Sequence, residues 1–63
     1  MYLLLTEKPT KEGAETLKYL VNMEHVHLIW TAEDGGARLD YEDAQLEVTE
    51  TFDQIAKWLS EGN

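Results

Sequence analysis

The sequence contains no cysteine, so it lacks the disulfides and cysteine-based zinc sites that stabilise many short chains. Its two histidines alone cannot supply the four ligands of a structural zinc ion. With 63 residues, of which 43% are hydrophobic, we expect one small domain over residues 1–63. A core of this size seldom contributes more than about 3–5 kcal/mol. Contacts between subunits would add stability, which favours a homo-oligomer.

Long hydrophobic runs are also missing. The longest aliphatic run is Leu3-Leu4-Leu5. It is far shorter than the roughly 20 residues of a membrane-spanning helix and shorter than the apolar segment of a secretory signal. The sequence therefore predicts a cytoplasmic protein without a membrane partner.

Basic residues are scarce: five Lys and Arg stand against 13 Asp and Glu, which gives a net charge of −8. A surface of this sign repels phosphate backbones and anionic lipids, so direct nucleic-acid binding is not expected. Nine of the acids lie at or after Glu33, where the only basic residues are Arg38 and Lys57. An acidic surface can imitate nucleic acid, although it is also typical of ordinary intracellular proteins.

The first 21 residues predict two extended segments around a polar loop. Residues 2–6 are short and apolar, as in a strand, and residues 8–15 contain the turn formers Pro9 and Gly13. Residues 16–21 fit a strand by alternation and also fit a helix that could begin near residue 10. We favour the strand and keep the helix as the alternative for residues 10–21.

The middle of the chain predicts a buried strand. A tight connection over residues 22–24 precedes residues 26–31, which are apolar at both odd and even positions. This pattern indicates burial on both faces of the strand. We therefore expect Trp30 to share a face with Val26 and Leu28 and to lie in the core.

Two further strands follow, separated by turns. Residues 33–36, Glu-Asp-Gly-Gly, provide the positive φ angles that tight hairpin turns require. Residues 37–41 alternate between apolar and polar side chains, as a half-buried antiparallel strand does. Residues 42–44 form the next turn, and the alternation of Leu46 and Val48 with polar neighbours predicts a last strand.

The C-terminal segment predicts a helix. Thr51 and Gln54 match a capping box, and Gly62 marks the end of the helix. One apolar stripe should lie on the sheet, formed by Phe52, Ile55, Ala56 and Leu59. The predicted fold class is thus α+β: a small antiparallel β-meander of four to five strands, with barrel-like closure as one option, and one C-terminal helix.

No pattern in the sequence indicates an enzyme. On a strand, His25 and His27 would share a face and could bind one cation with Glu24 nearby, but alternating polar residues are also typical of the wet side of a half-buried strand. No serine, cysteine or lysine has a recognisable nucleophile context. We therefore predict no catalytic residue, no metal site and no cofactor.

Three residues are candidates for binding. Trp58 lies about 120° around the helix from Phe52, where an indole either contacts a partner or completes the core at a sheet edge. Arg38, the lone arginine, could clamp an anion or simply balance carboxylates such as Glu33, Asp40 or Glu47. Tyr41 could stack on a nucleotide base.

Two segments resemble the small FlbD/SwrD family of flagellar and swarming-motility proteins. They are Leu20-Val21-Asn22-Met23-Glu24-His25-Val26 and the stretch from Leu46 to Ile55, Leu-Glu-Val-Thr-Glu-Thr-Phe-Asp-Gln-Ile. The resemblance covers roughly residues 17 to 59 and implies a β-meander followed by a capped helix. The chain differs from the family in its longer loop over residues 8–15 and in having Thr51 where serine is expected. No functional residue is transferred by it.

The sequence supports three hypotheses about function. The first is a small, non-enzymatic interaction module of bacterial or phage type, homo-oligomeric, which regulates or assembles with a protein partner. The second is a phage-type oligomeric sponge that sequesters a small nucleotide signal through Arg38 and Trp58 or Tyr41. The third is an acidic inhibitor that imitates nucleic acid and occupies a basic groove.

Overall fold

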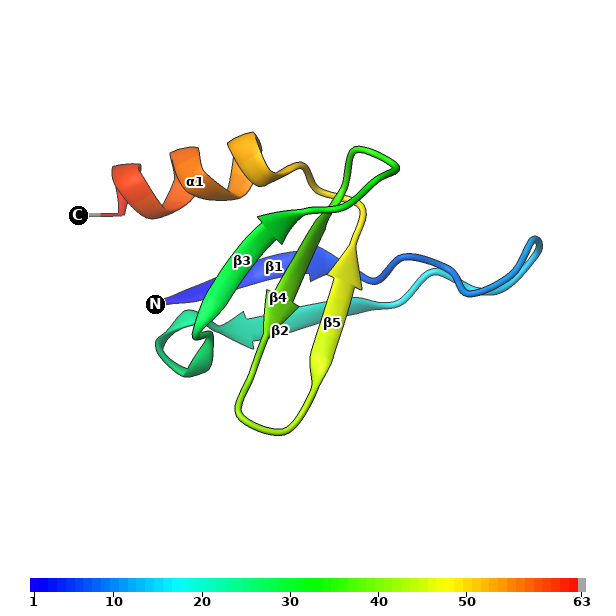
Figure 1. The fold of residues 1–63 in the computed structure, drawn as a ribbon, viewed down its shortest axis with the longest axis horizontal. Coiled ribbons are helices and arrows are strands. Elements are labelled where there is room, and N and C mark those ends of the chain that lie inside the picture. Colours follow the sequence, from blue (N-terminus) through cyan, green and yellow to red (C-terminus); the bar gives the residue numbers. More distant parts are fainter. Residues whose placement is uncertain (63) are drawn as a thin grey trace.

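A computed structural model describes residues 1–62 and shows an α+β fold with five antiparallel strands and a C-terminal helix (Figure 1). Seven elements follow one another along the chain. They are β1 (Tyr2–Thr6), β2 (Lys18–Asn22), the 3₁₀ helix η1 (Met23–His25), β3 (Leu28–Thr31), β4 (Ala37–Asp40), β5 (Gln45–Val48) and α1 (Phe52–Glu61). The predicted fold class and the single helix are confirmed.

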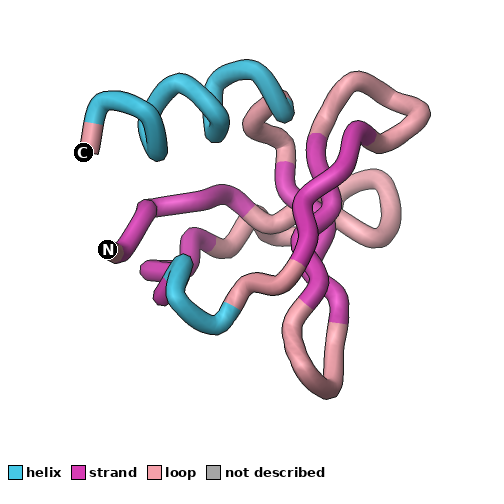
Figure 2. The backbone as a smooth tube through the Cα atoms, turned by 60° about the vertical axis from the view of Figure 1, so that its left-hand side comes forward, coloured by secondary structure: helices cyan, strands magenta, loops and turns pink. Residues whose placement is uncertain are grey.

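The strands form two sheets, not one continuous meander. β1 pairs with β2, and β3, β4 and β5 form a second sheet in that order. The two sheets cross (Figures 1 and 2) and are joined where the chain leaves β1: Lys8 N donates to Glu47 O at 2.9 Å, and Thr49 N donates to Thr6 O at 2.9 Å. The barrel-like option is wrong, because this junction is short and the sheets do not close on each other.

Residues 18–22 are a strand, so the favoured alternative is confirmed and the helical one is wrong. Glu7 N donates to Leu17 O at 2.8 Å, which extends the β1–β2 ladder toward the loop. Gly13 has a φ of +83°, a conformation that would interrupt a helix beginning near residue 10. The loop projects away from the body of the molecule as a long hairpin tip (Figure 1).

The strand predicted over residues 26–31 is shorter and less buried than expected. Asn22 accepts a hydrogen bond from Glu24 N and caps η1, so the chain returns to extended pairing only at Leu28. Leu28 is 55% exposed, and Trp30 is half-buried opposite Arg38, on the face directed away from the core. The predictions of burial on both faces and of a core Trp30 are wrong. Val26 does pack against the core, on the other side from Leu28 and Trp30.

The turn and the helix cap form as predicted. Gly35 has a φ of +93°, and the Asp34 carboxylate accepts a hydrogen bond from Gly36 N at 3.2 Å. A side chain at position 36 would collide with the Val48 carbonyl, so this position requires glycine. At the other end of the domain, Thr51 and Gln54 form both hydrogen bonds of a capping box.

The core lies between the two sheets and α1. Each element except β3 and η1 contributes at least one buried side chain: Leu5, Val21, Ala37, Leu39, Val48 and Ile55. Phe52 and Leu59 flank Ile55 on the helix and are half-buried, whereas Ala56 is exposed and the stripe is narrower than predicted. No helix within residues 1–62 has the length and apolar character to cross a membrane. This core is small, and several large apolar side chains lie outside it.

Candidate functional site

The most exposed apolar surface is the outer face of the β1–β2 hairpin. Alternation along the paired strands directs Leu5 and Val21 inward, where they are buried, and directs six other side chains outward. We call this surface the hairpin face. It comprises Tyr2, Leu4 and Thr6 from β1 and Lys18, Leu20 and Asn22 from β2.

The centre of the hairpin face is apolar and open to solvent. Leu4 and Leu20 are directly opposite each other in the ladder, and their exposed fractions are 58% and 67%. Tyr2, beside them, is 60% exposed. Exposed apolar side chains that lie together are typical of contact surfaces, whereas single exposed ones are ordinary. The arrangement is therefore suited to packing against another apolar surface.

The sequence contained a signal for this surface that the strand prediction did not use. Leu3, Leu4 and Leu5 are consecutive, so a strand through them must place an apolar residue on each face. Only one face can contact the core of a two-layer domain. The other face was a predictable site of exposure.

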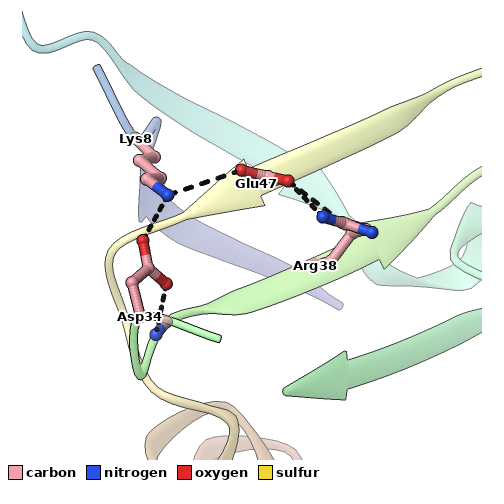
Figure 3. Close-up of polar contacts among 5 residues, drawn as sticks. Lys8, Asp34, Arg38 and Glu47 are labelled. Atoms are coloured by element: carbon pink, nitrogen blue, oxygen red, sulfur yellow. Dashed lines mark hydrogen bonds and ion pairs between the residues drawn. The ribbon is translucent and has the colours of Figure 1, made fainter. Parts of the chain in front are cut away.

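A second cluster crosses the outer face of the three-stranded sheet and contains the candidate Arg38 (Figure 3). Arg38 on β4 is paired in register with Glu47 on β5, and its Nε and Nη2 donate to Glu47 Oε1 at 3.1 and 2.5 Å. Lys8 Nζ lies 3.8 Å from Glu47 Oε2 and also pairs with Asp34 in the β3–β4 turn. We call Lys8, Asp34, Arg38 and Glu47 the ion-pair row.

Trp30 closes the other end of the ion-pair row. Its ring lies under the Arg38 guanidinium, with 5.7 Å between the guanidinium carbon and the ring centroid. An open depression of about 440 Å³ lies between Trp30, the turn and Glu47. Both cations of the row already have carboxylate partners, and Arg38 also covers the indole. The depression therefore offers little free positive charge to an anionic ligand.

The ion-pair row shifts two titrating groups in opposite directions. The hydrogen bond from Lys8 lowers the pKa of Asp34, and the Gly36 N–H contributes in the same direction. The same contact with Asp34 raises the pKa of Lys8. Both side chains are exposed to solvent, where ion pairs are screened and contribute little stability. The ion-pair row therefore links three segments at the surface: the residues after β1, strand β5 and the β3–β4 turn.

The three predicted binding residues lie on different parts of the molecule. Arg38 is on the outer face of the three-stranded sheet, where Glu47, one of its three predicted carboxylate neighbours, binds it. Tyr41 follows β4 on the core side, and partial burial raises the pKa of its hydroxyl. Trp58 is on α1 and is 36% exposed. One copy of the chain therefore does not bring the three residues together, and Arg38 is already paired with Glu47.

The two histidines do not share a strand face. His25 belongs to η1, and His27 precedes β3, where its imidazole lies 4.0 Å from the Glu42 carboxylate. Across the described part of the chain, no three His, Cys, Asp or Glu side chains are grouped closely enough to hold a metal ion.

No protein-family model, no curated protein and no solved structure matches this chain. The resemblance to the FlbD/SwrD family therefore stays a prediction based on the two sequence segments. The candidate surfaces rest on the geometry of this chain alone.

Proposed function

We propose that this protein is a small, acidic, non-enzymatic interaction module that self-associates and regulates or assembles with a protein partner. The observation that supports this function is the clustering of exposed apolar residues. Of the eight large hydrophobic residues that are exposed in residues 1–62, six lie within the first 20 positions. They are Met1, Tyr2, Leu4, Leu17, Tyr19 and Leu20, of which Tyr2, Leu4 and Leu20 share the hairpin face.

Energetic considerations favour burial of this surface. The domain is small, and its core alone is expected to supply only about 3–5 kcal/mol. Covering a further 200 Å² or so of apolar surface would add about 5 kcal/mol before the entropic cost of association is subtracted. Self-association could therefore raise the free energy of unfolding by an amount comparable to the stability of the monomer itself.

Sedimentation velocity over a wide concentration range tests the self-association. We expect the average mass to rise above that of the 7.3 kDa monomer as concentration increases, and the melting temperature to rise with it. A stably folded monomer throughout the micromolar range would contradict the homo-oligomer. Affinity capture from the native source, followed by mass spectrometry, would then identify the protein partner.

The charge distribution favours the acidic nucleic-acid mimic as a second candidate function. Residues 24–63 contain ten of the 13 acidic residues and only two basic ones. Most of these carboxylates are exposed: Glu24, Glu33, Asp34, Glu42, Asp43, Asp53 and Glu61. A mimic of this kind should bind a basic protein groove with an affinity that falls steeply as salt rises. A complex insensitive to salt would contradict this candidate.

A further inference from the structure

The charge of this protein is confined to one part of the chain. Residues 1–23 contain three acidic and three basic side chains, so their charges cancel. The whole net charge of −8 therefore belongs to residues 24–63. The β1–β2 hairpin lies within the neutral part. Two copies that met through this hairpin would avoid direct contact between their acidic segments.

The composition of the hairpin face matches that of a protein–protein interface. None of its six side chains is acidic, although the chain has 13 acidic residues. Its centre is the Leu4–Leu20 pair, and Thr6, Lys18 and Asn22 form a polar rim around it. An apolar centre depleted in charge, with polar residues at the margin, is the usual anatomy of interfaces.

The area of the face is consistent with a weak dimer. A large side chain such as tyrosine buries about 150–250 Å² when it is fully covered. Three side chains that are about 60% exposed would thus contribute roughly 300–400 Å² per copy. A standard interface buries about 800 Å² per partner. The polar rim would have to supply the remainder, and an interface below the standard size indicates a weak dimer.

We propose that a second copy of this chain covers the hairpin face, so that Leu4 and Leu20 of one copy pack against Leu4 and Leu20 of the other across a two-fold axis. This inference rests on the proposed function and names its partner and its surface. A two-fold interface uses the same patch on both copies, and one neutral apolar patch is sufficient for it. The acidic segments remain outside the contact.

Charge insertion tests the proposal. Leu20→Asp places two carboxylates at the centre of the dimer, whereas Leu28→Asp changes a similarly exposed leucine on the other sheet. We expect Leu20→Asp to weaken self-association by at least about 100-fold and Leu28→Asp to leave it within about threefold. Circular dichroism of both variants checks that the fold is retained. Leu4→Asp provides a second variant in case Leu20→Asp fails to fold.

Thiol crosslinking gives an independent test, because the natural chain has no cysteine. Leu20→Cys should form a covalent dimer in high yield with a short bis-maleimide reagent, and the yield should fall when unlabelled wild-type protein is added. Leu28→Cys is the matched control and should give only a background yield. Equal yields at the two positions would contradict a dimer through the hairpin face.

The outcomes separate the inference from the proposed function. If the wild-type protein self-associates and Leu20→Asp or Leu4→Asp associates equally well, the dimer uses another surface; the inference is then wrong and the proposed self-association stands. If the wild-type protein is a folded monomer throughout the micromolar range, both the inference and the self-association are wrong. The hairpin face would then be covered by a different protein or by none.

Discussion

Replacement of Ile55 by alanine tests how α1 is attached to the sheets. Ile55 is the only fully buried side chain described on the helix, and it contacts a core built from both sheets. The change removes three carbon atoms, which accounts for about 2.4 kcal/mol of transfer free energy. The cavity left behind adds to this, so we expect a loss of about 3–4 kcal/mol.

Urea titration followed by tryptophan fluorescence and far-ultraviolet circular dichroism measures this loss. Because the total stability of so small a core is about 3–5 kcal/mol, Ile55→Ala should be only marginally stable, with a substantial unfolded fraction at 25 °C before urea is added. Leu28→Ala is the control and should cost less than about 1 kcal/mol, since Leu28 is mostly exposed. A loss below about 1 kcal/mol for Ile55→Ala would show that α1 does not pack on the core as described.

Three further predictions use the same unfolding measurements. Thr51→Ala removes the acceptor for Gln54 N and should cost about 1 kcal/mol, whereas Thr51→Ser should cost far less. Trp58→Ala should cost about 2–3 kcal/mol, because nearly two thirds of the residue is covered, and an unchanged melting temperature would contradict this packing. Partial burial raises the pKa of Tyr41 above its usual 10.0 in the folded state. Its contribution to stability should be complete below about pH 10 and lost as the pH rises further, so stability that stays constant to pH 12 would contradict this shift.

The features that the sequence predicted well depend on nearby residues. The turn at residues 33–36 needs the positive φ of Gly35, and the helix begins where Thr51 and Gln54 exchange hydrogen bonds. The alternation over residues 37–40 correctly identified Ala37 and Leu39 as buried. Each of these features is determined by residues about four positions apart or fewer, so a local sequence pattern is sufficient to identify it.

The errors arose where the outcome depends on distant residues. The way the two sheets are joined depends on backbone hydrogen bonds between the end of β1 and β5, about 40 residues apart. Trp30 was predicted in the core because it shares a strand face with Val26 and Leu28, yet the register with β4 places it beside Arg38. An aromatic ring on an outer face can be stabilised there by a cation above it. Neither the register nor this contact can be read from one strand.

The candidate site was predictable only in part. The pairing of Arg38 with Glu47 was among the expected alternatives, because both lie on the polar face of adjacent strands. Lys8 was missed, since it lies in a loop that reaches β5 only after the sheets cross. The hairpin face was missed because consecutive leucines predict that one face of the strand is exposed, but they do not show whether Leu4 or Leu5 lies on that face.

Salt should affect the two proposed complexes in opposite ways. Electrostatic interactions oppose the homodimer, whereas they favour a complex with a basic partner. In a homodimer through the hairpin face, the contact is apolar and the acidic segments of the two copies repel each other. Raising NaCl from about 0.05 to 0.5 M screens this repulsion, so self-association should be unchanged or tighter. A basic partner bound to residues 24–63 would instead lose attraction over the same range. Sedimentation of the protein alone across this salt range measures the salt dependence of self-association. If self-association weakens as salt rises, the dimer contact is ionic and the hairpin face is not its centre.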